Sequence, residues 1–205
     1  NKAHPQSQVQ NMTGFRLDKG GLIERRQKIN FRFNGQQVTG FKGDTIASAL
    51  MASGHMLVGR SFKYHRPRGV MSAGVEEGGA LFNTGDGAAR VPNVKGTVTE
   101  ISEGLTVYSQ NVFPSLGFDL GAVNGLIAPF ITAGFYYKTF MGPFANTKFW
   151  MLCERFIRRA AGLGQASQEA DPSTYDIANG FCDALVIGSG PAGLTAAAGL
   201  AEKGL

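Results

Sequence analysis

The sequence predicts an α+β domain followed by the start of an α/β domain, and three observations support this. Near the beginning of the 205-residue chain, two strand-like patterns flank Asn34-Gly35, and a short helical pattern follows them. A long segment rich in aromatic residues comes next. At the far end, a short apolar run passes through a glycine-rich turn into an alanine-rich helical pattern.

The first part of the chain is predicted to form a β-hairpin and then a helix. Residues Ile29–Phe33 alternate between apolar and polar, which is the period of a half-buried strand, and Gln37–Gly40 forms the returning strand. The Asn34-Gly35 pair between them is the strongest short signal for a hairpin turn. Residues 43–45 place a capping side chain before a helix over Ile46–Ala52. A hairpin followed by a helix is the opening of the β-grasp fold, which plant-type ferredoxins and ubiquitin share.

Three further segments can supply the remaining strands of this domain. They are Ala80–Thr84, Val98–Ile101 and Leu105–Val107, with a turn at residues 102–104. We therefore expect a β-grasp, ferredoxin-like domain over residues 21–114. Residues 1–20 are polar and rich in Gln and Asn, which predicts a flexible N-terminal arm.

The loop that would hold an iron–sulfur cluster in a ferredoxin lacks the residues for it. Such clusters are bound by cysteine thiolates. The chain has two cysteines, Cys153 and Cys182, and both come after this domain. The sequence thus predicts a ferredoxin-like domain without a cluster, and no metal site. Glu76 and Glu77 could be metal ligands or an acid/base pair, but because no histidine is near them we expect both to be solvated.

A basic stretch, Arg60–Gly69, interleaves arginines and a lysine with aromatic residues. One hypothesis is nucleic-acid binding, because aromatics stack on bases and arginines meet phosphates. A second, which we favour, is a loop that meets carboxylate partners through bidentate arginines. The third is a packed, salt-bridged interface loop. The net charge of +5 is concentrated in such local patches, so no nucleic-acid partner is predicted.

Residues 115–180 form a connector that is too long for a plain linker. Its many aromatic side chains must be buried against a domain or a partner subunit. Within it, Phe149–Ala161 is predicted to be a helix, and Gln165–Asn179 a polar linker. The uncharged stretch Leu120–Tyr137 contains a proline and three glycines. We interpret it as a buried, irregular segment and not as a membrane span. With no secretory pattern at the start and no disulfide framework, the expected compartment is the cytoplasm.

Residues 181–205 are predicted to be the first βα unit of a Rossmann-type dinucleotide-binding domain. The buried strand Ala184–Ile187 leads directly into Gly188-x-Gly190-x-x-Gly193. The first glycine makes the tight turn, the second lets the backbone approach a pyrophosphate, and the third lets the helix pack closely. The alternative is a tight turn that binds nothing. The acidic residue that would hold the ribose belongs about 20 residues further on. We therefore expect this chain to be a piece of a longer one, and the motif alone does not separate NAD from NADP or FAD.

Taken in order, these motifs carry a family resemblance. They are GDTIASALMASG (residues 43–54), RSFKYHRPRG (60–69), GFYYKTF (134–140), AAGLG (160–164) and DALVIGSGPAGLTAA (183–197). From about residue 16 onwards the chain closely resembles the N-terminal part of the alpha subunits of heterotetrameric, tetrahydrofolate-linked sarcosine oxidases. Related subunits of hydrogen cyanide synthases and of opine or proline dehydrogenases are also similar, but several of them keep cysteines in the ferredoxin-like domain.

The resemblance implies a subunit of an enzyme complex. Such a complex demethylates sarcosine oxidatively to glycine, reduces oxygen to hydrogen peroxide and passes the one-carbon unit to tetrahydrofolate. FAD in the beta subunit takes the hydride, FMN lies at the alpha–beta interface, and the alpha subunit holds NAD. By motif match, the residues at the NAD site are Gly188, Ser189, Gly190, Pro191, Ala192 and Gly193.

The same resemblance implies beta, gamma and delta subunits as partners, and it places the catalytic residues for sarcosine outside this chain. Two alternatives stay open. One is a subunit of a related flavin-dependent amino-acid or opine dehydrogenase, and the other is a non-catalytic assembly module.

Overall fold

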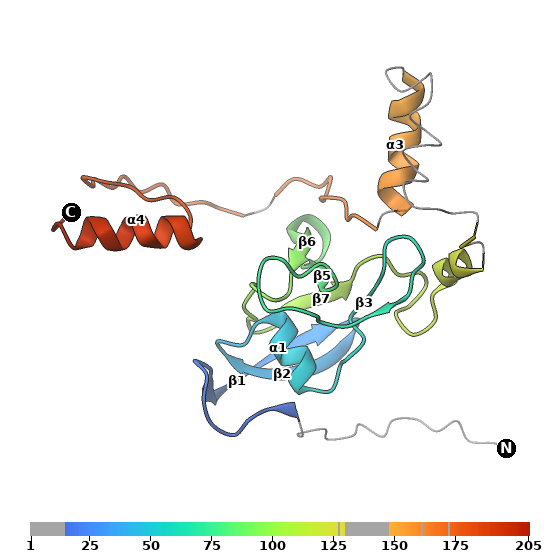
Figure 1. The fold of residues 1–205 in the computed structure, drawn as a ribbon, viewed down its shortest axis with the longest axis horizontal. Helices are drawn as coiled ribbons and strands as arrows, with labels where there is room; N and C mark the ends of the chain where they lie inside the picture. Colours follow the sequence, from blue (N-terminus) through green and yellow to red (C-terminus); the bar gives the residue numbers. More distant parts are fainter. Residues whose placement is uncertain (1–14, 127, 130–147, 161, 172) are drawn as a thin grey trace. The chain divides into compact units, whose positions relative to one another are not determined.

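The computed structural model describes residues 15–126, 128–129, 148–160, 162–171 and 173–205. The chain divides into two compact units, Asn1–Asp171 and Pro172–Leu205, and each is described by itself (Figure 1). The strands are β1 (Glu24–Phe33), β2 (Gln36–Lys42), β3 (Gly59–Arg60), β4 (Pro67–Arg68), β5 (Leu81–Thr84), β6 (Val91–Lys95) and β7 (Thr106–Ser109). The helices are α1 (Ile46–Ala52), α3 (Lys148–Ala160) and α4 (Pro191–Ala201), with short 3-10 turns η2 (Gly87–Ala89) and η3 (Leu120–Gly125).

The first unit contains a mixed sheet with the strand order β2-β1-β7-β5-β6. Strands β1 and β2 form the predicted hairpin, with Phe33 paired to Gln36 across the Asn34-Gly35 turn. Strand β7 returns parallel to β1, and β5 pairs antiparallel with both β7 and β6. A hairpin, a helix and a last strand placed parallel to the first make the predicted β-grasp topology, so this expectation is confirmed.

The core lies between α1 and one face of the sheet. Ile46 and Leu50 of α1 are fully buried, and they join Phe31, Phe33 and Phe82 from the strands in one apolar cluster. The Phe33 and Phe82 rings meet edge to face, with centroids 6.0 Å apart and planes at 83°. In β1, the alternation of side chains between the two faces of the sheet points Phe31 and Phe33 into the core, which is why the period-2 pattern predicted this strand.

The helix α1 begins where the capping residues predict. Thr45 is its N-cap, and the Thr45 and Ser48 side chains exchange hydrogen bonds with each other's backbone N–H groups in a capping box. Asp44, one residue earlier, is 1% exposed. It accepts two hydrogen bonds from the Arg16 guanidinium, at 3.0 and 2.7 Å, and others from Ser48 and the Phe41 N–H. Arg16, from the predicted arm, is therefore tied to the start of the helix.

This network makes a pH-dependent contribution to stability. Desolvation on burial raises the pKa of Asp44, but the hydrogen bonds from Arg16, Phe41 and Ser48 outweigh it, so the pKa lies below its ordinary value of 3.8. The stabilisation from this carboxylate is complete above the unfolded-state pKa, and it is lost as the pH falls through the folded-state pKa. Asp44→Asn should lower the free energy of unfolding at neutral pH by about 1.5–3 kcal/mol.

Denaturant unfolding of both proteins, from neutral pH to below 3.8, checks this prediction. The difference in the free energy of unfolding between wild type and Asp44→Asn should become smaller as the pH falls. Asp18→Asn is the matched control, because Asp18 lies in the same N-terminal segment and is exposed. If this difference is the same at every pH, the stabilisation does not depend on the charged form of Asp44, and the prediction is wrong.

One predicted strand is wrong, and the strand that takes its place was missed. Residues 98–101 form a turn and an isolated bridge from Glu100 to Thr45, although Ile101 still reaches the core and is 4% exposed. The actual strand is β6, at the edge of the sheet. Its Pro92 argues against a strand in the sequence, but an edge strand tolerates proline because one side makes no ladder hydrogen bonds.

The helix predicted over Phe149–Ala161 is confirmed as α3 up to Ala160, and Ala161 lies outside the described residues. Residues 130–147, which contain many of the connector's aromatic side chains and the second part of the uncharged stretch, lie outside the described residues. No helix in the described part of the chain is long and apolar enough to cross a membrane. In the second unit, α4 forms as expected, but the predicted strand Ala184–Ile187 does not. A strand requires a hydrogen-bonding neighbour, and the described residues of this unit contain none.

Candidate functional site

The glycine-rich turn has the backbone that its sequence predicts. Gly188 has φ +111°, a conformation that side chains rarely adopt. A Cβ on Gly193 would lie 2.1 Å from the Gly188 carbonyl oxygen, so the first turn of α4 packs directly on the preceding loop. At Gly190, by contrast, an added Cβ meets nothing within 4 Å. The three glycines thus differ: the first and third serve the turn itself, and the second faces open space.

The beginning of α4 leaves donors available. Gly190 is the N-cap and provides no side-chain cap, and Pro191 occupies the first helical position. The N–H groups of the first turn have no partner within the helix, and the macrodipole adds roughly half a positive charge there. This combination suits a phosphate group. The structure thus places Ser189, Ala192 and the three glycines in one turn at the start of α4. Leu185 and Ile187 before this turn are 74% and 89% exposed.

The basic stretch Arg60–Gly69 is organised around contacts inside its own unit. The Arg60 guanidinium donates to the Leu116 carbonyl at 2.6 and 3.1 Å and to the His65 carbonyl at 3.2 Å. The His65 Nδ1 lies 2.6 Å from the Asp119 carboxylate, whose side chain is completely buried. Because the Arg60 guanidinium already donates to backbone carbonyls of its own unit, the favoured hypothesis of bidentate carboxylate binding is wrong for Arg60. The packed-loop alternative describes Arg60 and His65, which contact residues 116–119 just before η3. The stretch from Leu120 onwards was expected to be buried, and this is wrong for its described start, because Leu120 and Val123 are 50% and 58% exposed.

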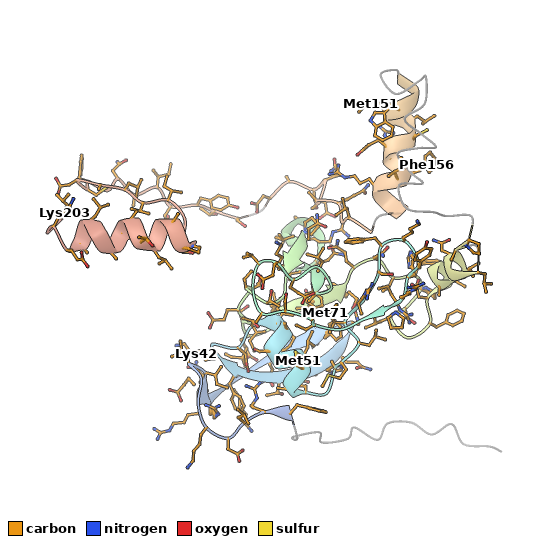
Figure 2. All side chains as sticks on the ribbon, in the orientation of Figure 1. Lys42, Met51, Met71, Met151, Phe156 and Lys203 are labelled. Carbon is orange, nitrogen blue, oxygen red and sulfur yellow. The ribbon has the colours of Figure 1, made fainter. Side chains whose placement is uncertain are left out.

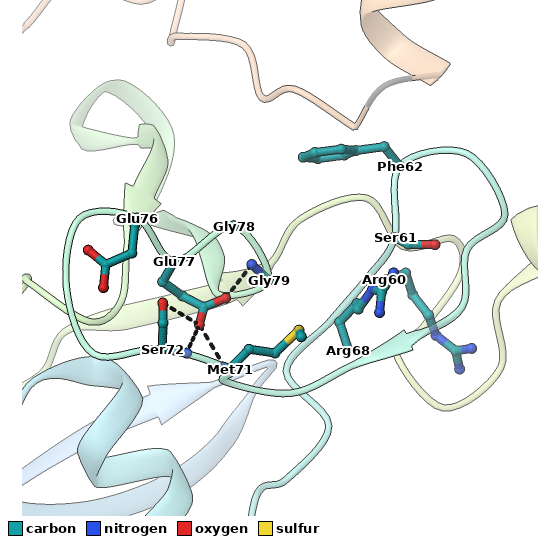
Figure 3. A pocket seen from close by; sticks show the side chains of 10 residues that line it. All are labelled: Arg60, Ser61, Phe62, Arg68, Met71, Ser72, Glu76, Glu77, Gly78 and Gly79. Carbon is teal, nitrogen blue, oxygen red and sulfur yellow. Dashed lines mark hydrogen bonds between the residues drawn. The ribbon is translucent and has the colours of Figure 1, made fainter. Parts of the chain in front are cut away.

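Two other cationic side chains of this stretch lie over an aromatic ring. The Lys63 ammonium and the Arg66 guanidinium each lie 5.0 Å from the centroid of the Tyr64 ring. Arg66 and Arg68 are exposed. Arg68 lines a cavity of about 350 Å³, together with Phe62 and the loop at residues 71–79 (Figure 3).

The two adjacent glutamates behave differently, and the expectation that both are solvated is wrong for Glu77. Glu76 is exposed, whereas Glu77 is 2% exposed. The Glu77 carboxylate accepts hydrogen bonds from the N–H groups of Met71 at 2.7 Å, Ser72 at 2.6 Å and Gly79 at 2.5 Å (Figure 3). These bonds satisfy the carboxylate without any histidine, so the lack of a nearby histidine does not make this glutamate a solvated one. The flanking Gly78-Gly79 pair was the only signal in the sequence that the chain folds back at this point.

The environment of Glu77 favours its charged form. Desolvation on burial raises the pKa of Glu77, but the hydrogen bonds from the Ser72, Gly79 and Met71 N–H groups outweigh it, so the pKa lies below its ordinary value. Among the described residues, no group of three or more His, Cys, Asp and Glu side chains could hold a metal ion. Glu77 is therefore a buried anion held by backbone donors.

Comparison with known proteins gives this arrangement its context. A family model described as a 2Fe-2S iron-sulfur cluster binding domain matches residues 26–112. The sarcosine oxidase subunit alpha of Rhizobium meliloti (strain 1021) is 55% identical over 187 residues, which cover 91% of this chain and 19% of that protein. The subunit of the same name from Corynebacterium sp. (strain U-96) is 29% identical over 185 residues, covering 90% of this chain and 14% of that protein.

These relatives confirm the predicted resemblance to sarcosine oxidase alpha subunits, and the chain spans less than a fifth of their length. Among solved structures, L-proline dehydrogenase from P. horikoshii is similar with a TM-score of 0.34 and 16% identity, covering 48% of this chain and 18% of that one.

Proposed function

We propose that this chain, a homologue of sarcosine oxidase alpha subunits, serves in a complex that demethylates sarcosine oxidatively to glycine. Oxygen is reduced to hydrogen peroxide, and tetrahydrofolate takes the one-carbon unit. The observation that carries the proposal is the 55% identity to the Rhizobium meliloti subunit over 91% of this chain. The reaction itself takes place elsewhere in the complex, on FAD and FMN that other parts of the assembly bind.

The part played by this chain is to hold NAD. The residues proposed to bind it are Gly188, Ser189, Gly190, Pro191, Ala192 and Gly193. Two features support this: the uncapped N-terminus of α4 and the open space beside Gly190. NAD would bring two phosphates with negative charge, and the backbone N–H groups at the start of α4 would bind and orient them. In this proposal residues 181–205 open a Rossmann-type domain, whose central strand would form only against neighbouring strands of that domain.

The second role proposed for this chain is assembly with the beta, gamma and delta subunits. The large apolar side chains exposed on α3 support this proposal. Met151, Leu152 and Phe156 are 63%, 56% and 70% exposed, and Figure 2 labels the first and last of them on the helix. Apolar side chains that gather on one element and face water mark a contact surface. We place the complex in the cytoplasm, on the cysteine usage of the chain.

Oxygen uptake by the full-length protein, co-expressed with its neighbouring subunits, tests the substrate. Adding sarcosine should start oxygen consumption with stoichiometric hydrogen peroxide, because an oxidase returns the substrate electrons to oxygen. Glycine, the demethylated product, is the matched control addition and should give neither. If sarcosine does not reduce the flavins of the complex at all, the substrate proposal fails.

A flavin-dependent amino-acid or opine dehydrogenase is the second candidate. It predicts that substrate bleaches the flavin absorbance without oxygen uptake, and that an added quinone or carrier restores turnover. A non-catalytic assembly module predicts no bound nucleotide in the full-length chain. The NAD content of the purified complex, measured after denaturation, separates that reading from the other two.

A further inference from the structure

The match to a 2Fe-2S cluster binding domain disagrees with the donor atoms that this chain provides. A [2Fe–2S] cluster is bound by cysteine thiolates, with histidine replacing some of them in one class. The matched residues 26–112 contain no cysteine, and the two cysteines of the chain are Cys153 in α3 and Cys182 in the second unit. The residues therefore do not fit the cluster, and something else must organise the loop between β4 and β5.

In that loop, residues 70–79, backbone N–H groups are arranged so that they bind an anion. The N–H groups of the successive residues Met71 and Ser72 converge on one carboxylate oxygen of Glu77, and the Gly79 N–H meets the other oxygen. Successive backbone N–H groups that point at one place form the concavities in which proteins bind phosphates and many iron–sulfur centres. Here the concavity is filled by a side chain of the same loop, as Figure 3 shows.

We propose that the Glu77 carboxylate takes the place of the cluster as the anion that holds this loop closed. The domain then keeps the ferredoxin-like fold without iron, and it carries no electrons between the flavins of the complex. Besides Glu77, three charged residues line the cavity beside this loop: Arg60, Arg68 and Glu76. Arg60 is engaged with the Leu116 carbonyl, and Glu76 is exposed. The donors that reach Glu77 are backbone N–H groups and the Ser72 hydroxyl, at 3.4 Å.

A glutamine cannot replace this carboxylate, although it has the same shape. Glu77 accepts on both oxygens, which lie between the N–H groups of Met71 and Ser72 on one side and of Gly79 on the other. A glutamine has one acceptor oxygen and one NH₂ group. Whichever way the amide turns, its NH₂ faces a backbone N–H, so at least one buried donor loses its partner.

Hydrogen exchange of the full-length subunit in its complex tests the proposal. Peptides that cover residues 70–80 should be protected in the wild type, and in Glu77→Gln they should exchange about tenfold faster or more. Glu76→Gln is the matched control, because it makes the same change one residue away on an exposed side chain, and it should exchange like the wild type. Peptides covering β1 and β2 should be unchanged in both variants.

Iron loading of the wild-type complex is the second measurement, and it does not depend on how well the variant folds. Anaerobic reconstitution with iron and sulfide should leave no stoichiometric iron and no cluster absorbance. Stoichiometric uptake of both would overturn the proposal. Unprotected wild-type peptides, or equal exchange in Glu77→Gln and Glu76→Gln, would overturn it as well. None of these readouts depends on the substrate or the flavins, so a failure here is distinct from a failure of the proposed function.

Discussion

Gly190→Ala is expected to lower the affinity of the full-length complex for NAD roughly five- to 150-fold, which corresponds to about 1–3 kcal/mol of overpacking. The backbone of Gly190 has φ −73° and ψ 173°, which alanine adopts without strain. The added methyl group meets no protein atom within 4 Å. It would therefore leave the folded turn intact and occupy only the space into which the pyrophosphate is proposed to come.

The matched control for this variant is Gly199→Ala, in the same helix. Its added methyl group also meets nothing within 4 Å, and alanine is favoured over glycine inside a helix by roughly 0.5–1 kcal/mol. NAD released on denaturation and NAD affinity measured by calorimetry are the two readouts. If both variants have the NAD content and the NAD affinity of the wild type, residues 188–193 are not the nucleotide site. The alternative of a turn that binds nothing then gains support.

Phe82→Ala is expected to destabilise the β-grasp domain by about 3–5 kcal/mol, the range for truncating a buried phenylalanine. Phe82 is 0% exposed, and it packs edge to face on Phe33 in the core beneath α1. Its ring also lies against Gly96, where an added Cβ would come within 2.3 Å of it. The truncation would open a cavity that the tightly packed surroundings cannot fill.

Native-state hydrogen exchange at β5 and β7 measures this loss in the full-length protein, because core strands exchange through global opening. Phe118→Ala is the control, since the Phe118 side chain is 66% exposed in the same unit. It should change the opening free energy by less than about 0.5 kcal/mol. A similar, small effect of both variants would contradict the assignment of Phe82 to the core.

Local patterns in the sequence were sufficient for the elements that depend on neighbouring residues. The hairpin at Asn34-Gly35, the capped helix over 46–52 and the glycine turn before α4 all formed as predicted. In each, the deciding contacts join residues a few positions apart, such as Thr45 with Ser48. The edge strand β6 was missed because its Pro92 is tolerated only by its place at the sheet edge, which no local pattern reveals.

The sequence by itself determined the ferredoxin-like β-grasp class, the lack of cluster cysteines and the candidate nucleotide turn, because residue identity and short spacing decide all three. The tertiary structure alone decided the roles of Glu77 and Arg60. In sequence, Glu76 and Glu77 are equivalent, and only the fold brings three backbone N–H groups to one of them. Arg60 finds the Leu116 carbonyl 56 positions away. The partners of Glu77 are only two to six positions away, but their N–H groups reach its carboxylate only in the folded loop. Burial and hydrogen bonding are properties of the folded structure, so the roles of these two charged side chains were decided there.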